Sequence, residues 1–131
     1  MKGSYALLIR LNKDTNIGIG AFMVIHFPKG YYMYIGSALN SIEGRVGRHL
    51  SNIKKVHWHI DYLLEKAEVS KVYYRESRKR TECSLADKFA GRFHVVPNFG
   101  SSDCRCIGHL FLGKKKELIN CALKNGMKEF H

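Results

Sequence analysis

The chain has 131 residues, 45% of them hydrophobic, and 22 Lys and Arg against 11 Asp and Glu give it a formal net charge of +11. Its seven Phe, seven Tyr and one Trp argue against disorder, and no apolar run approaches the roughly 20 residues of a membrane span. The N-terminal segment lacks the small-residue cleavage site of a secretory signal. We therefore expect one cytoplasmic domain over residues 1–131, with no membrane contact and a polyanionic partner.

Three apolar and aromatic segments near the N-terminus have the composition of β-strands. They cover residues 4–11, 18–27 and 31–36, and the polar segments 12–16 and 28–30 read as the turns between them. Because short turns join neighbouring antiparallel strands, this part of the chain predicts an antiparallel meander.

Apolar residues recur at three- and four-residue steps in the rest of the chain, which predicts helices separated by short strands. The expected helices cover residues 41–54, 58–67, 81–92 and 114–124, and the expected strands cover residues 69–74 and 108–112. Asn40 or Ser41 is the expected N-cap of the first helix, Thr81 caps the third, and Asn125-Gly126 ends the fourth. This order of elements predicts an α+β fold with a small central antiparallel sheet flanked by helices.

The four cysteines are expected to be reduced thiols, because nothing marks the chain as secreted. Cys104, Cys106 and His109 form a C-x-C-x2-H cluster that offers three ligands for zinc. The alternative is a loop with partly buried thiols, which the tight C-x-C spacing and the missing fourth ligand favour.

Five residues have the chemistry that cleavage of a phosphodiester bond requires. Tyr5 and Tyr34 lie on strands that can be neighbours, and Arg45 and His49 lie one helical turn apart on one face. Glu82 opens the third expected helix, where a semi-buried carboxylate can hold a divalent cation. Each residue also has a structural interpretation: tyrosines packed in the core, a solvated Arg/His face, and a glutamate that favours the helix dipole.

As a set, these residues resemble the motifs of the GIY-YIG nuclease superfamily. Gly3-Ser4-Tyr5 is similar to the GIY element with Ser in place of Ile, and Tyr34-Ile35-Gly36 is the YIG element. The run from Arg45 to His49 resembles the family's helix that bears an Arg, and Glu82 matches its metal-binding Glu. Further marks, at residues 36–38, 58–62 and 99–104, resemble a small stand-alone, archaeal-like branch grouped with the Uri-type nucleases.

The resemblance implies a DNA endonuclease that uses one Mg²⁺ or Mn²⁺. It implies that Tyr5 and Tyr34 position or deprotonate water, that Arg45 stabilises the phosphoryl charge and that Glu82 anchors the metal. His49, on the Arg45 face, is our candidate proton acceptor. His59 is the second choice, and its alternative role is a histidine at the edge of the core, hydrogen-bonded to Asp61 or to the backbone.

Basic residues near this set are expected to hold DNA through its phosphates, because the chain has no room for a separate DNA-binding domain. They are Lys54, Lys55, Arg75, Arg78, Lys79 and Arg80. A homodimer is one expected partner, because double-strand breaks by one site per chain need two copies, and another protein that supplies target specificity is the alternative.

Two other functions compete with the nuclease. One is a non-catalytic nucleic-acid-binding module with the same fold, and the other is a zinc-stabilised RNA-binding protein that uses Cys104, Cys106 and His109.

Overall fold

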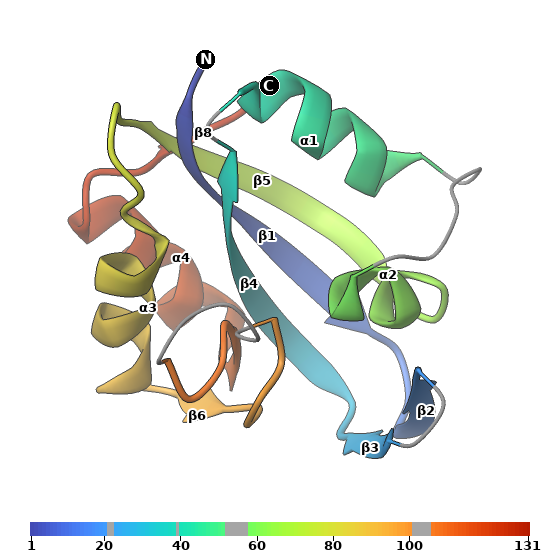
Figure 1. Ribbon diagram of the computed structural model, residues 1–131. Coiled ribbons are helices and arrows are strands. Elements are labelled where there is room, and N and C mark those ends of the chain that lie inside the picture. The colour runs from blue at the N-terminus through green and yellow to red at the C-terminus, as the bar shows by residue number, and fades with distance from the viewer. Residues whose placement is uncertain (21–22, 39, 52–57, 101–105) are drawn as a thin grey trace.

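A computed structural model describes residues 1–20, 23–38, 40–51, 58–100 and 106–131, and these residues form an α+β fold, as predicted (Figure 1). The strands are β1 (Gly3–Leu11), β2 (Thr15–Ile19), β3 (Met23–Phe27), β4 (Gly30–Ala38), β5 (Glu68–Glu76), β6 (His94–Val95), β7 (Leu110–Gly113) and β8 (Lys128–Glu129). The helices are α1 (Ile42–Leu50), α2 (His59–Leu64), α3 (Glu82–Ala90) and α4 (Lys115–Lys124).

Six strands form the central sheet in the order β6-β7-β4-β1-β5-β8, and every pairing in it is antiparallel. The centre of the sheet is β1, which pairs with β4 on one side and with β5 on the other. Only one of its nine residues, Arg10, is exposed, because both faces of the strand are covered. The apolar composition of the strand follows from this position.

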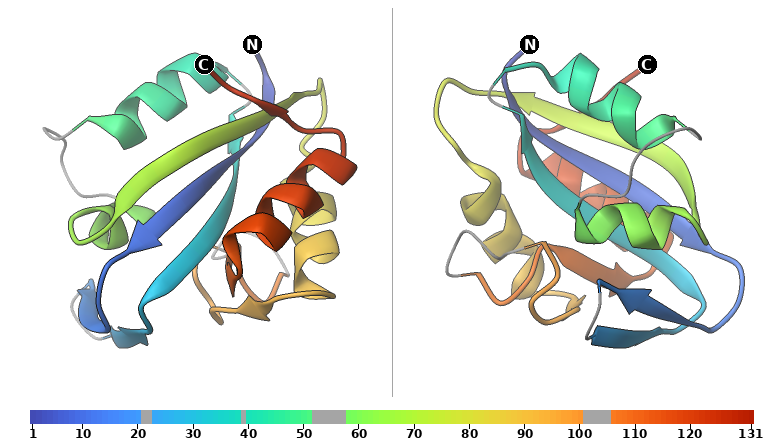
Figure 2. Two further views of the ribbon diagram at one scale, coloured as in Figure 1. Left: turned by 180° about the vertical axis from the view of Figure 1, so that it is seen from behind. Right: turned by 45° about the vertical axis from the view of Figure 1, so that its right-hand side comes forward.

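Helices cover both faces of the sheet, with α1 and α2 on one side and α3 and α4 on the other (Figures 1 and 2). Alternate residues of β1 supply the two cores: Leu7 and Ile9 pack with Val46 of α1 and Leu63 of α2, whereas Leu8 faces the α3 and α4 side. Burial of the apolar stripes on both faces is what holds the helices to the sheet.

The predicted strand over residues 18–27 is wrong, because this part of the chain forms two strands. β2 and β3 pair with each other in a two-stranded sheet of their own. Gly20 follows β2 with a φ of +68°, a conformation that reverses the chain at little cost only for glycine. The predicted meander is therefore also wrong: β1 pairs directly with β4, and the hairpin lies at the end of these strands (Figure 1).

The first helix begins as predicted and ends earlier. Ser41 is its N-cap and accepts a 3.0 Å hydrogen bond from the Gly44 N–H. Ser51 takes an extended conformation and its N–H bonds back to the Arg48 carbonyl at 3.3 Å, so α1 ends at Leu50 instead of residue 54. In the described part of the chain, no helix is long and apolar enough to cross a membrane.

Candidate functional site

The pairing of β1 with β4 brings the two predicted tyrosines together. Tyr5 lies opposite Gly36 and Tyr34 lies opposite Leu7, so both tyrosines project from the same face of the sheet. Their ring centroids are 6.4 Å apart, and both side chains are largely buried. The predicted neighbourhood of Tyr5 and Tyr34 is therefore present, although the chain between them contains a hairpin.

Gly36 leaves the space that the Tyr5 ring occupies. A Cβ atom at Gly36 would clash with the Cζ, the hydroxyl oxygen and the Cε1 of Tyr5. The glycine of the Tyr34-Ile35-Gly36 motif therefore allows the Tyr5 side chain to cross β4 and reach α1.

His49 meets the hydroxyl group of Tyr5 from α1. Its Nε2 lies 2.7 Å from the Tyr5 hydroxyl oxygen, in a buried hydrogen bond. The His49 ring also packs against both tyrosines, at 5.3 Å from Tyr5 and 6.2 Å from Tyr34 between centroids. Because Arg45 lies one turn before His49, α1 presents a cation and an imidazole to the same pair of tyrosines.

The electrostatics of Tyr5 reflect the groups around its hydroxyl. Burial raises the pKa of Tyr5 well above its usual value, and the charge of Tyr34 adds to this rise. Arg45 lowers the pKa through its charge and through a hydrogen bond, and Glu82 raises it slightly. The hydroxyl therefore stays protonated at neutral pH, and four of the predicted residues act on it.

Trp58 organises the cations of α1, which sequence reasoning missed. The guanidinium carbons of Arg45 and Arg48 lie 4.4 and 4.2 Å from the centroid of its ring. Arg48 also donates two hydrogen bonds, of 2.8 and 2.9 Å, to the carboxylate of fully buried Asp61. Asp61 in turn accepts a 2.8 Å hydrogen bond from the Trp58 N–H, so the start of α2 is tied to α1. The sequence signals for this arrangement were the three-residue spacing of the two arginines and the motif over residues 58–62, which contains both Trp58 and Asp61.

Glu82 begins α3 and is 6% exposed. Before it, Thr81 holds the N-cap position, but its hydroxyl bonds to Ser4 of β1 at 2.7 Å and does not cap the helix as predicted. This bond places the first turn of α3 beside Tyr5. The Glu82 Oε1 lies 2.5 Å from a guanidinium nitrogen of Arg80, so this carboxylate has a cationic partner.

His59 lies behind this cluster. Its Nδ1 accepts a 3.1 Å hydrogen bond from the Gly100 N–H, and its ring packs against Phe99 at 5.7 Å. A Cβ atom at Gly100 would approach the Tyr34 ring to 3.0 Å. The position of His59 matches its predicted alternative role, a histidine at the edge of the core hydrogen-bonded to the backbone.

The basic residues predicted to hold DNA differ in their surroundings. Arg78 and Lys79 are exposed in the turn between β5 and α3. Arg75 is partly buried and donates a 2.9 Å hydrogen bond to the Asn125 carbonyl at the end of α4, and Arg80 pairs with Glu82. Lys54 and Lys55 lie outside the described residues.

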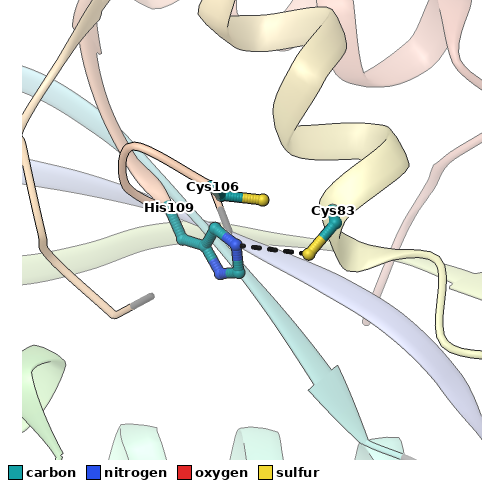
Figure 3. A group of neighbouring side chains, drawn as sticks. All are labelled: Cys83, Cys106 and His109. Carbon is teal, nitrogen blue, oxygen red and sulfur yellow. Dashed lines mark hydrogen bonds between the residues drawn. The ribbon is translucent and has the colours of Figure 1, made fainter. Parts of the chain in front are cut away.

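A second group of side chains lies beside the first. Cys83, Cys106 and His109 have ligand atoms within 4.8 Å of one another, close enough to hold a metal ion together (Figure 3). Cys104, which the sequence analysis placed in this set, lies outside the described residues. Sequence reasoning missed Cys83 because it lies on another element, more than twenty residues before Cys106.

The fold and the site together define a small α+β protein in which two buried tyrosines and a buried histidine lie with a partly exposed arginine, beside a glutamate and a thiol-imidazole group. The chain belongs to the family described as domain of unknown function DUF123, whose model matches residues 4–131. No curated protein and no solved structure matches the chain.

Proposed function

We propose that this protein is a divalent-metal-dependent endonuclease that hydrolyses phosphodiester bonds in DNA, the activity that its resemblance to the GIY-YIG superfamily implies. The observation that carries the proposal is the surroundings of the Tyr5 hydroxyl. His49 lies 2.7 Å from it, and Arg45, Tyr34 and Glu82 act on its pKa. Four polar or charged residues from three elements converge on one buried hydroxyl, which a core tyrosine does not need.

Arg45 is the group proposed to bind the phosphoryl oxygens. Its stacking on Trp58 restricts the guanidinium to one orientation beside Tyr5. A fixed cation stabilises the charge that develops on the phosphate in the transition state.

Glu82 is the residue proposed to hold Mg²⁺ or Mn²⁺. A single buried carboxylate fits an ion of this class, since Mg²⁺ keeps several waters and takes its remaining ligands from one or two carboxylates and the substrate phosphate. A bound ion would supply Lewis-acid polarisation of the phosphate. To bind it, Glu82 must exchange its ion pair with Arg80, whose side chain is half exposed.

Tyr5 and His49 are proposed to orient the attacking water and to move its proton. The raised pKa of Tyr5 argues against a phenolate base at neutral pH, so Tyr5 acts as a hydrogen-bonding group. It donates to His49 when the imidazole is neutral with an unprotonated Nε2. The proton then moves in two linked steps: the attacking water gives its proton to the Tyr5 oxygen, and Tyr5 passes its own proton to the Nε2 of His49, which is the final acceptor. Tyr34 packs beside the His49 ring.

Nicking of a supercoiled plasmid in Mg²⁺ or Mn²⁺ tests the proposal, with DNA binding measured on the same samples. We expect Arg45→Ala to lower the nicking rate about 10²–10³-fold. Arg10→Ala, which removes an exposed cation of β1, is the matched control and is expected to keep the wild-type rate. Equal nicking by the wild type and the Arg45 variant would refute the assignment.

The pairing of Glu82 with Arg80 favours one second candidate, a nucleic-acid-binding module without catalysis. A carboxylate already neutralised by a guanidinium is a stable structural pair, and binding through phosphates needs no metal. Salt-sensitive DNA binding by the wild-type protein, without nicking in either metal, would establish this candidate in place of the nuclease.

A further inference from the structure

Cys83, Cys106 and His109 come from two separate parts of the chain. Cys83 is the second residue of α3, and the other two lie on the segment that enters β7. Their side chains point towards one another in the space between α3 and this segment (Figure 3). His109 is buried, and both cysteines are partly buried and free of disulfides.

The spacing of the ligand atoms is that of a tetrahedral metal site. With Zn–S near 2.3 Å and Zn–N near 2.0 Å, two ligand atoms of one tetrahedral ion lie roughly 3.5–3.8 Å apart. The Cys83 Sγ and the His109 Nε2 are 3.9 Å apart, and all three ligand atoms lie within 4.8 Å. A disulfide would need the two sulfurs about 2.05 Å apart, so a metal ion requires the smaller rearrangement.

The chemistry of the donors selects the metal. Two thiols and an imidazole are ligands for zinc, whereas magnesium and manganese prefer oxygen. Among the described residues, no carboxylate belongs to this group. The group is therefore chemically distinct from Glu82, although Cys83 is the residue that follows Glu82.

The backbone of His109 connects this group to the strand that bears Tyr34. Its carbonyl accepts a 2.9 Å hydrogen bond from the Ile35 N–H, and its N–H donates to the Phe99 carbonyl at 2.8 Å. β7 pairs with β4 only as far as Tyr34. Beyond this pair, the hydrogen bond between Ile35 and His109 extends the contact along the same edge of β4. An ion bound to Cys83 and His109 would join the first turn of α3 to this edge.

We infer that Cys83, Cys106 and His109 bind one Zn²⁺ through two thiolates and an imidazole, and that the ion fixes the first turn of α3 against β4. The first part stands on the geometry of the three side chains alone. The second part stands on the hydrogen bond between His109 and Ile35 of β4. Its consequence, that the zinc positions Glu82 for DNA cleavage, rests on the proposed nuclease function. The remaining position of a tetrahedral ion is left to water.

Metal analysis of protein purified under reducing conditions tests the ligand set. We expect about one zinc per chain in the wild type and at least about tenfold less in Cys83→Ser, Cys106→Ser and His109→Asn. Cys121→Ala, which changes a buried cysteine of α4, is the control and keeps its zinc. If Cys104→Ser lost its zinc and Cys83→Ser kept a full equivalent, the proposed ligand set would be overturned. Wild-type protein that binds no zinc would overturn it as well.

Cobalt titration of the metal-free wild type does not depend on whether a variant folds. Thiolate-to-cobalt charge-transfer absorption is expected to rise and saturate at one equivalent and to disappear when zinc is added. A titration without this absorption would overturn the inference.

Amide hydrogen exchange tests the positioning role without using activity. The Leu85 N–H, bonded to the Thr81 carbonyl at 3.0 Å, reports on the first turn of α3. Removal of zinc is expected to speed its exchange at least about tenfold, while exchange in the middle of β1 stays unchanged. Equal exchange with and without zinc would overturn the positioning role. A protein that binds zinc and never nicks DNA would refute the nuclease function and leave the zinc site standing.

Discussion

At the scale of single residues, the candidate site depends on close contacts with Tyr5. Its ring crosses β4 where Gly36 has no side chain, and its hydroxyl reaches His49 at 2.7 Å. Any atom added at Gly36 has to displace the ring, because the residues before and after Gly36 are held in place by pairing with β1. The glycine of the motif therefore has a steric explanation that does not depend on its own backbone conformation.

Gly36→Ala is expected to lower the free energy of unfolding by about 1–3 kcal/mol, since the new methyl group overpacks the Tyr5 ring. Gly47→Ala is the matched control: it lies in α1 with no atom within 4 Å of an added Cβ. This control is expected to raise stability by about 0.5–1 kcal/mol, because alanine favours the helix. Urea denaturation measures both, and a Gly36 variant as stable as the wild type would contradict the packing described.

The sequence predicted the residues of the first cluster better than those of the second. Each residue of the first cluster belongs to a motif on a single element, so the pairing of β1 with β4 and the packing of α1 and α3 were enough to bring them together. These residues are Tyr5, Tyr34, Arg45, His49 and Glu82. Cys83 could not be predicted as a partner of His109, because their contact depends on where α3 packs. Proximity in the sequence favoured Cys104 instead.

At the scale of elements, the contact between α1 and α2 depends on one buried carboxylate. Asp61 accepts two hydrogen bonds from Arg48 and one from the Trp58 N–H, and its side chain has no exposed surface. A buried charge of this kind is stable only while its partners remain. Trp58, positioned in this way, is the ring on which Arg45 stacks.

Asp61→Ala is expected to lower the free energy of unfolding by about 3 kcal/mol, because Arg48 loses its partner and the start of α2 loses its cap. Asp87→Ala on α3 removes an exposed carboxylate and is expected to change stability by less than about 0.5 kcal/mol. Thermal or urea unfolding of the two variants checks this difference. Equal stability of the two variants would show that the buried pair is not needed.

Elements with clear periodicity were predicted, and those defined by a turn or by edge pairing were not. The apolar stripes of α1, α3 and α4 were visible in the sequence, as were β1 and β5. The apolar run that contains β2 and β3 read as one strand because a hairpin and a single buried strand have similar composition. The two-residue strands β6 and β8 are too short for any pattern and exist through pairing with β7 and β5.

At the scale of the whole molecule, several tyrosines are buried and stay protonated. Burial raises the pKa of Tyr5, Tyr32 and Tyr73 above the usual tyrosine value. The unfolded chain therefore releases these protons at a lower pH than the folded protein does. Their contribution to stability is complete below about pH 10 and is lost as the pH rises towards the folded pKa values.

We therefore expect the free energy of unfolding to fall above about pH 10, with each such tyrosine contributing a slope of at most about 1.4 kcal/mol per pH unit. Tyr5→Phe removes one of these groups, so its stability is expected to fall less steeply with pH than that of the wild type. Urea unfolding at several pH values measures both slopes. Parallel curves for the two proteins would contradict the raised pKa of Tyr5.

Part of the excess positive charge lies on exposed residues close in sequence to the proposed site. Arg78 and Lys79 are exposed in the turn that leads into α3, just before Arg80, which pairs with Glu82. Cations beside the proposed site would attract DNA in a salt-dependent manner. The same fold thus places both the proposed chemistry and part of the proposed binding surface at the start of α3.

The central claim is that Glu82 and the Tyr5 cluster hydrolyse DNA with a divalent metal. The most direct measurement is the nicking rate of supercoiled plasmid in Mn²⁺ by the wild type, by Glu82→Gln and by the control Glu76→Gln, which changes an exposed carboxylate of β5. We expect metal-dependent nicking by the wild type and the control, and a rate at least about 100-fold lower for Glu82→Gln. Nicking by Glu82→Gln at the wild-type rate would contradict the account, and so would the absence of nicking by all three proteins.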